Sequence, residues 1–309
     1  ALRRRLRSRG ARAVDGTGGA AVSVVALLLV AWLFGTAVNA SPFRGTAEAV
    51  RGSRVLTGVD DVLPPAAAVL ASTLRQVVDT RVFPEVFGGL RPPSLAPAPP
   101  PDPALLTSPA VQAAADSVVR VFGLRAACDG GSTGSGFVFA PERVMTNAHV
   151  VAGVRDPAVA LGDRTYDATT VHFDAEVDVA VLAVPGLGAP PLAFAGPAER
   201  GADAVVVGHP GGGPFTATPA RVRQELDARG LDIYGSDPVV REVYALVSAV
   251  RPGNSGGPLL DETGDVYGVV FAAAADQTDV GYALTADEVA DAAAAGAATG
   301  REVGTGPCA

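Results

Sequence analysis

The chain has 309 residues, of which 32 are acidic and 24 are basic, and every basic residue is arginine. Residues 1–103 hold 12 arginines against 7 acids (+5), whereas residues 104–309 hold 12 arginines against 25 acids (−13). An acidic surface repels phosphate backbones, so the larger part is not expected to bind nucleic acid, and the length allows two domains.

The first predicted element is a transmembrane helix over residues 20–38, within a segment of residues 1–40. These 19 residues carry no charge and are long enough to cross a hydrocarbon core of about 30 Å. The arginine-rich flank before them predicts a location at the cell membrane, with the rest of the chain extracytoplasmic. A cleaved signal peptide is the alternative, because residues 38–40, Val-Asn-Ala, are typical of a cleavage site. Since the chain begins with Ala1, we expect a fragment or a processed product.

Two segments are expected next, a juxtamembrane helical segment over residues 41–87 and a proline-rich linker over residues 88–109. Residues 66–82 carry apolar side chains at helical spacing, which predicts an amphipathic helix. The linker has eight prolines in 22 residues. So many prolines favour an extended polyproline II conformation, and we expect a semi-rigid spacer.

The remaining residues, 110–309, are predicted to form one all-β domain. Short apolar runs are separated by Gly, Pro and Asp, and their spacing favours a pair of antiparallel β-barrels over a parallel sheet. The runs expected in the first barrel cover residues 117–124, 136–140, 143–146 and 178–184. Those expected in the second cover residues 202–208, 221–226, 242–250, 266–273 and 281–284. Thr285 and Glu288 form a capping-box pattern, which predicts a closing C-terminal helix to about residue 295.

Three motifs in this domain carry the groups that a serine nucleophile needs. Ser255 lies in Val-Arg-Pro-Gly-Asn-Ser-Gly-Gly-Pro-Leu, residues 250–259, where flanking glycines allow the amides of Gly253 and Ser255 to form an oxyanion hole. His149, in Thr-Asn-Ala-His-Val-Val, offers a base to take the serine proton. Asp178, directly before the apolar run Val-Ala-Val-Leu, offers a carboxylate to orient that base. The order His, Asp, Ser is that of chymotrypsin.

Two other acids compete with Asp178 for the orienting role. Asp174 and Glu176 lie in the same segment. Asp178 is preferred because the apolar run begins immediately after it, at the entrance of a buried strand, and Asp174 is the next choice.

Residues 134–138, 146–151, 178–182 and 253–259 resemble the HtrA-type trypsin-like serine proteases. More closely, the chain resembles the membrane-anchored serine proteases of actinobacteria that have a CvpA-like membrane region and no PDZ domain. The resemblance covers roughly residues 110–290 by specific motifs and residues 1–90 only by pattern. It implies a chymotrypsin-like double antiparallel β-barrel, with the catalytic groups in the cleft between the barrels, and protein or peptide substrates.

The resemblance also implies where the specificity pocket lies. The residue six before the nucleophile, Ala249, would form the base of this pocket, and Phe271, Ala272 and Ala273 would form its wall. None of these side chains carries a carboxylate to pair with Arg or Lys in a substrate, so we expect a preference for small or medium apolar side chains.

The two cysteines, Cys128 and Cys308, are expected to form a disulfide, because in an extracytoplasmic compartment two lone cysteines are more often bridged than free. Two unpaired thiols are the alternative. A metal site is not expected, since no two of the three histidines, His149, His172 and His209, are at ligand spacing. No cofactor is needed for the expected chemistry, and the oligomeric state is left open.

Three functions are compatible with these features. The first is a membrane-anchored serine endopeptidase that acts through a Ser-His-Asp acyl-enzyme mechanism. The second is an inactive protease fold used as a membrane-tethered scaffold, which predicts a missing catalytic residue, whereas none is missing here. The third is a regulator of a membrane transport or secretion component, for which a single predicted spanning helix is too little to form a pore alone.

Overall fold

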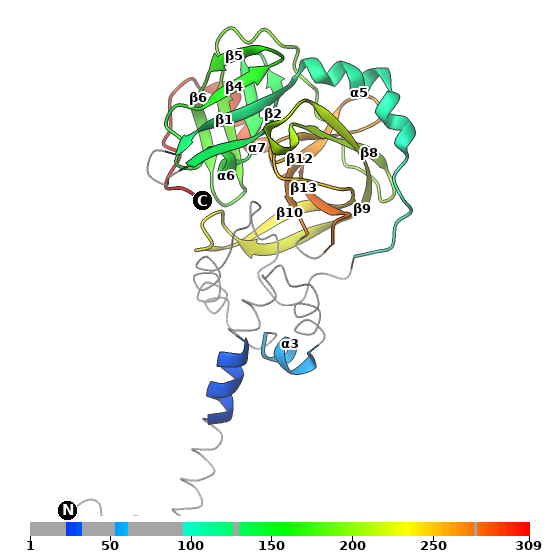
Figure 1. The fold of residues 1–309 in the computed structure, drawn as a ribbon, viewed down its shortest axis with the longest axis vertical. Helices are drawn as coiled ribbons and strands as arrows, with labels where there is room; N and C mark the ends of the chain where they lie inside the picture. The colour runs from blue at the N-terminus through cyan, green and yellow to red at the C-terminus, as the bar shows by residue number, and fades with distance from the viewer. Residues whose placement is uncertain (1–22, 33–52, 61–94, 126–129, 275–276) are drawn as a thin grey trace, which may run out of the picture. The chain divides into compact units, whose positions relative to one another are not determined.

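A computed structural model describes residues 23–32, 53–60, 95–125, 130–274 and 277–309 of the chain. The chain divides into two compact units. In the smaller unit, residues 23–32 form one helix and helix α3 spans Arg54–Asp60. The larger unit contains every strand of the described residues and all of the predicted site residues that are described (Figure 1).

The transmembrane helix predicted over residues 20–38 is not found among the described residues. In that region, the described residues 23–32 are helical. Throughout the described segments, no helix combines the length and the apolar character that a membrane span requires. This finding contradicts the predicted location at the cell membrane, which depended on that helix. The remainder of residues 1–40 and the helix predicted over residues 66–82 lie outside the described residues.

The first half of the larger unit is a curled antiparallel sheet of seven strands in the order β5-β4-β1-β2-β3-β7-β6 (Figure 1). Runs rich in valine form these strands because β-branched side chains suit a pleated, half-buried surface, and their inward side chains form a core. The sequence predicted a closed barrel here, whereas this sheet keeps β5 and β6 as its edges. The strands are β1 (Val118–Arg125), β2 (Gly130–Ala140), β3 (Arg143–Thr146), β4 (Ala158–Leu161), β5 (Arg164–Asp167), β6 (Thr169–Asp174) and β7 (Val179–Ala183). Helix α6 (Ala148–Val151) follows β3.

The second half is a closed antiparallel barrel in the order β10-β13-β12-β11-β8-β9, as predicted. Its side chains join those of the first sheet in one core that contains residues of both, including Phe137 and Phe271. The strands are β8 (Asp203–Gly208), β9 (Thr216–Leu231), β10 (Pro238–Val247), β11 (Pro258–Leu260), β12 (Val266–Ala273) and β13 (Val280–Thr285), with a short 3₁₀ turn, η4 (Pro210–Gly212), after β8.

The long hairpin of β9 and β10 extends from the barrel to the first sheet. Asp232 stabilises its tip by accepting hydrogen bonds from main-chain amides of the turn. The Ile233 amide donates a hydrogen bond of 3.2 Å to the Ala175 carbonyl. The Ile233 side chain packs with Ala148 and Ala152, which lie on either side of His149 in the chain. The barrel therefore supports the segment of the first sheet that carries the predicted base.

The C-terminal helix is present but begins later than predicted. The Glu288 amide donates to Thr285 Oγ1 at 3.0 Å, which is one half of the predicted capping box. The Glu288 carboxylate, however, accepts a 3.0 Å hydrogen bond from the Glu242 amide of β10. Helix α7 accordingly spans Ala290–Ala298 rather than starting after Thr285.

Helix α7 and the residues after it return to the first sheet. Gly296 packs so closely on β7 that an added Cβ would lie 2.6 Å from Val181 side-chain atoms. Arg143 of β3 donates to the Gly296 and Thr299 carbonyls, and the Val303 amide donates to the Thr170 carbonyl at 2.9 Å. The residues after the last strand of the barrel thus pack against the first sheet and join the two halves.

The described part of the predicted linker differs from a free spacer. Residues 95–109 contain the 3₁₀ turn η2 (Pro103–Thr107), and α5 (Pro109–Ala113) and η3 (Ala114–Asp116) follow. The Ala96 amide donates to Gln224 Oε1 at 2.8 Å, and Arg223 donates back to the Ala96 carbonyl at 2.9 Å. These two hydrogen bonds hold the segment against β9. They pair main-chain groups of Ala96 with side chains of the barrel. Residues 88–94 lie outside the described residues, and the boundaries of the four predicted segments stay predictions.

The acidic cluster before α7 makes stability depend on pH. Burial raises the pKa of Glu288, the Glu242 amide hydrogen bond lowers it, and the charge of Glu242 raises it again, with smaller opposing contributions from Arg241 and Asp174. A raised pKa means that the folded state binds this proton more tightly than the unfolded chain, so the stability from this group is fully present below pH 4.5, the ordinary pKa of a glutamate, and is lost as pH rises through the raised value.

We therefore expect Glu288→Gln to increase the melting temperature at pH 8 and to leave it nearly unchanged below pH 4.5. Glutamine keeps the oxygen that accepts from the Glu242 amide but carries no charge. Thermal unfolding followed by circular dichroism at both pH values measures the difference, with Glu302→Gln, in the exposed C-terminal tail, as the control. An equal shift at both pH values would show that the charge of Glu288 is not the cause.

Candidate active site

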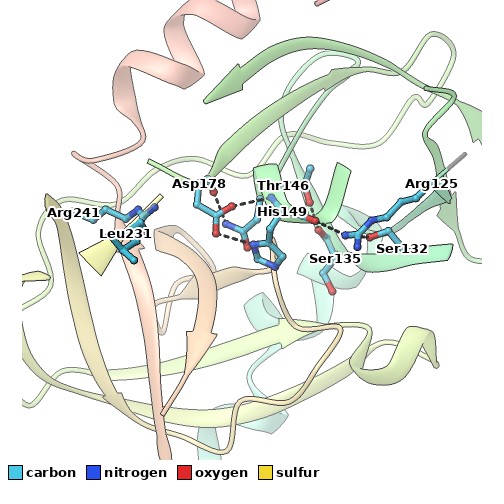
Figure 2. A network of polar contacts seen from close by, with 9 residues as sticks. Arg125, Ser132, Ser135, Thr146, His149, Asp178, Leu231 and Arg241 are labelled. Carbon is cyan, nitrogen blue, oxygen red and sulfur yellow. Dashed lines mark hydrogen bonds and ion pairs between the residues drawn. The ribbon is translucent and has the colours of Figure 1, made fainter. Parts of the chain in front are cut away.

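The predicted base, His149, lies on the short helix α6, directly after β3. Asn147 forms the N-cap of this helix, and the His149 side chain is nearly buried. Arg125 of β1 donates a 2.8 Å hydrogen bond from Nη2 to the His149 carbonyl, which fixes the main chain of the helix against the sheet (Figure 2). Burial lowers the pKa of this arginine.

Asp178 lies directly against His149 (Figure 2). Its carboxylate accepts a 2.9 Å hydrogen bond from the His149 amide at Oδ1, and Oδ2 lies 2.7 Å from His149 Nδ1. Asp178 is fully buried and adopts a φ of +70°, which is uncommon for a residue with a side chain and is a frequent feature of functional sites. An ionised carboxylate can only accept, so this contact places the proton of a neutral imidazole on Nδ1 and leaves Nε2 as the basic nitrogen.

The rival acid Asp174 has a different environment. Its Oδ1 accepts hydrogen bonds from the Glu176 and Val177 amides at 2.8 and 2.9 Å. These bonds close the turn between β6 and β7. Of the two acids, Asp178 and not Asp174 contacts the imidazole of His149. The turn that Asp174 stabilises precedes Asp178 and places it next to α6.

Ser255 lies in a tight loop between β10 and β11, in which Gly253 and Gly256 have φ values of +94° and +83°. The Gly211 amide donates to the Pro252 carbonyl at 2.7 Å, and the Gly257 amide donates to the Asn254 carbonyl at 2.9 Å. In a trans peptide the C=O and N–H point in opposite directions. The Gly253 and Ser255 amides therefore point away from these partners, and neither donates to another group of the described residues.

The Ser255 loop packs against the segment that carries His149. The Ser135 amide of β2 donates a 2.8 Å hydrogen bond to the Ser255 carbonyl. A Cβ added at Gly134 would lie 2.7 Å from Val150, the neighbour of His149, and 3.0 Å from the Ser255 carbonyl oxygen. Ser255 and His149, both within the described residues, are not hydrogen-bonded through their side chains. Hydrogen bonds of this kind are often long when no substrate is bound.

The four residues of the predicted specificity pocket differ in burial. Phe271 and Ala272 are fully buried, and Phe271 packs in the core shared by the sheet and the barrel. Ala249 is exposed and Ala273 is partly exposed. The preference for apolar substrates stays a prediction.

Four further residues around the site were not assigned a role from the sequence. Asn147 donates to the Asp178 carbonyl at 2.8 Å, Arg125 holds the His149 carbonyl, and Ser135 contacts the Ser255 loop. The fourth, Arg241 of β10, is fully buried and donates to the Leu231 carbonyl (Figure 2). Only Asn147 and Ser135 lie in motifs that could have drawn attention to them.

The charge of Arg241 lies close enough to the site to interact with Asp178. Burial lowers the pKa of Arg241, and the charges of Asp178, Glu288, Asp232 and Asp174 oppose that effect. A buried arginine thus accompanies the buried carboxylate that contacts His149. The sequence does not indicate that this arginine is buried, since most arginines in proteins are exposed.

Comparison with known proteins agrees with this geometry. A family model described as a trypsin-like peptidase domain matches residues 134–269. The serine protease Rv3671c of Mycobacterium tuberculosis is 45% identical over 311 aligned residues, which cover 100% of this chain and 78% of that protein.

Two solved structures show the same architecture. The crystal structure of the active form of the Rv3671c protease has a TM-score of 0.68 and 51% identity, covering 71% of this chain and 96% of that one. The HtrA-type protease AlgW with a tripeptide has a TM-score of 0.51 and 28% identity, covering 59% of this chain and 60% of that one. The resemblance to HtrA-type trypsin-like proteases is thereby confirmed. The chain belongs to this family of trypsin-like serine proteases, and it is an enzyme that hydrolyses peptide bonds.

Proposed function

We propose that this serine protease is an endopeptidase that cleaves protein substrates through an acyl-enzyme on Ser255, with His149 as general base and Asp178 as the orienting acid. The observation that carries the proposal is the pair of contacts from His149 to both oxygens of Asp178, at 2.9 and 2.7 Å. One contact fixes the main chain and the other fixes the ring, so the imidazole has a defined orientation and tautomer.

The proposed reaction begins when Ser255 Oγ attacks the scissile carbonyl and His149 Nε2 takes the hydroxyl proton. The negative charge that develops on the carbonyl oxygen is stabilised by the Gly253 and Ser255 amides, worth about 3–4 kcal/mol per donor in comparable sites. His149 then gives its proton to the leaving amine. Water repeats the sequence on the acyl-enzyme and releases the acid product.

The burial of Asp178 supports its proposed role. A carboxylate with no exposed surface is stabilised by the hydrogen bonds it accepts and by nearby positive charge, and it favours the imidazolium that forms during the reaction. The two amides of the Ser255 loop support the oxyanion hole, because neither donates to another group in the described part of the chain and both belong to peptides whose carbonyls are held.

An acyl-enzyme is tested by pre-steady-state kinetics with an activated ester. Because deacylation is slow for such substrates, we expect a burst of about one leaving group per chain, absent in Ser255→Ala. A peptide blocked at both ends tests internal cleavage in the same preparation. The proposed mechanism would be contradicted if the wild-type protein showed no burst and Ser255→Ala cleaved the substrate as fast as the wild type.

We also propose that Cys308 is bridged to Cys128, which lies outside the described residues. Cys308 is in the C-terminal tail, where a Cβ added at Gly153 would lie 2.6 Å from its Sγ. The Gly153 amide donates to the Thr305 carbonyl at 3.2 Å, and Thr305 donates to the Val154 carbonyl at 2.8 Å. The tail therefore covers the turn that follows α6, and a bridge would hold it there.

Reduction is expected to lower the melting temperature and to lower activity more than secondary structure. In the chain-entropy model a bridge closing about 180 residues contributes on the order of 4–5 kcal/mol, and small displacements of catalytic groups cost about 10²-fold in rate. Thermal unfolding and peptide cleavage with and without reductant measure both effects. Cys308→Ser, the control, should be insensitive to reductant. Two free thiols in non-reducing mass spectrometry would contradict the bridge.

A further inference from the structure

A buried hydroxyl of the first sheet contacts the main chain of the Ser255 loop. Ser135, on β2, is fully buried. Its Oγ donates a 2.7 Å hydrogen bond to the Gly253 carbonyl and accepts a 2.8 Å hydrogen bond from the His209 amide. A hydroxyl has one proton, so the bond accepted from His209 leaves that proton directed at Gly253.

The main chain of Ser135 holds the other end of the same loop. Its amide donates to the Ser255 carbonyl at 2.8 Å, and its carbonyl accepts from Thr146 Oγ1 at 2.7 Å (Figure 2). One residue of the sheet thus holds the carbonyls of both residues whose amides form the proposed oxyanion hole.

The direction of the Gly253 carbonyl is not set by Gly253 itself. This residue has a φ of +94° and no side chain, so its own conformational preferences do not define the direction of its carbonyl. The bond from Ser135 Oγ supplies that definition from across the interface between the sheet and the barrel, where Gly253 and Ser135 are 118 residues apart in sequence.

Two glycines of the barrel half pack closely against the Ser135 side chain. A Cβ added at Gly208 would lie 2.6 Å from Ser135 Oγ, and one added at Gly257 would lie 3.3 Å from Ser135 Cβ. The hydroxyl is the only group of the Ser135 side chain able to donate to Gly253.

We propose that Ser135 is a positioning residue that orients the oxyanion hole through its hydroxyl. The inference rests on the proposed roles of Gly253 and Ser255. The hydroxyl does not touch the substrate; it fixes the direction in which the loop presents its amides. We therefore expect the hydroxyl to affect kcat, which depends on formation of the oxyanion, and to have little effect on KM.

The test compares Ser135→Ala with Ser117→Ala in the full chain. Ser117 is an equally buried serine whose Oγ donates a 2.7 Å hydrogen bond to the Pro190 carbonyl, so the control removes a similar bond without touching the Ser255 loop. The measurements are kcat and KM for a blocked peptide, the affinity for a peptide aldehyde that forms a tetrahedral adduct, and the circular dichroism spectrum.

For Ser135→Ala we expect kcat to fall by about 10- to 100-fold, less than the roughly 10²–10³-fold cost of losing an oxyanion donor outright. KM should change by less than about twofold, and aldehyde affinity should fall by the same factor as kcat/KM, because both report the tetrahedral state. Ser117→Ala should keep kcat within about twofold. A second variant, Ser135→Cys, keeps a weaker donor and should be intermediate.

Unchanged kcat and aldehyde affinity in Ser135→Ala, or an equal loss in Ser117→Ala, would overturn the proposal. If Ser135→Ala does not fold, wild-type kinetics in Ser135→Cys would overturn it, and an intermediate kcat with unchanged KM would support it. Retained activity in Ser255→Ala would instead overturn the proposed function and this role together. Full activity in Ser135→Ala beside an inactive Ser255→Ala overturns the role of Ser135 alone.

Discussion

Ser255→Ala, His149→Ala and Asp178→Asn are each expected to lower casein and peptide cleavage by at least about 10³-fold while the domain stays folded. The first change removes the nucleophile and the second removes the base. The third keeps the shape of the acid but presents an amide to His149 Nδ1, from which it lies 2.7 Å in the native protein, and so favours the wrong tautomer. Initial rates at saturating substrate, with circular dichroism as the folding check, measure the loss.

The matched control for the acid is Asp174→Asn. Asp174 accepts two amide hydrogen bonds in the turn before Asp178, and asparagine keeps an oxygen for the same bonds. Its turnover should stay near that of the wild type. The double variant Ser255→Ala, His149→Ala should lose no more than the single variants, because the residues act as a unit. Near-normal turnover in Asp178→Asn, with loss in Asp174→Asn, would reverse the assignment of the acid.

Gly253→Ala is expected to lower kcat/KM by about 10²–10³-fold, the cost of losing an oxyanion donor. At a φ of +94° an added Cβ would lie 2.5 Å from the Gly211 nitrogen and 2.6 Å from the His209 carbonyl oxygen. Both atoms belong to the main chain, so the Ser255 loop must move, and its amides move with it. Steady-state kinetics on the purified variant measures the effect.

Gly201→Ala separates this displacement from backbone strain. Gly201 has a φ of +88°, but nothing lies within 4 Å of an added Cβ. The control therefore carries the same kind of conformational cost, about 1–3 kcal/mol of stability, without a collision. We expect it to keep the wild-type kcat/KM. If both glycine variants lose activity equally, general destabilisation rather than the oxyanion loop explains the result.

The sequence predicted the parts of the protein that depend on local pattern. Valine-rich runs separated by turn residues predicted an all-β fold, and the second barrel is closed as expected. The order of His149, Asp178 and Ser255 predicted a serine protease, and the comparisons confirm that family. A choice between Asp174 and Asp178 rested only on which acid adjoins a buried strand, and this criterion identified the acid that contacts the imidazole.

The features that the sequence did not predict depend on contacts between distant residues. The bond between Ser135 and Gly253 joins β2 to the loop after β10, and no local pattern indicates it. The reach of the β9–β10 hairpin to Ala148 depends on strand lengths and barrel closure. The hydrogen bonds of Ala96 to β9 could not be predicted either, because composition indicates what a segment cannot form by itself and not which surface it contacts.

The proposed role of Ser255 is tested directly by mapping a covalent fluorophosphonate adduct. The proposed mechanism makes Ser255 the one activated serine, so the wild-type chain should gain about one adduct, located by peptide mass spectrometry on the peptide that contains Ser255. Ser255→Ala should gain none, and His149→Ala should react far more slowly. An adduct on another serine, or equal labelling of Ser255→Ala, would contradict the central claim.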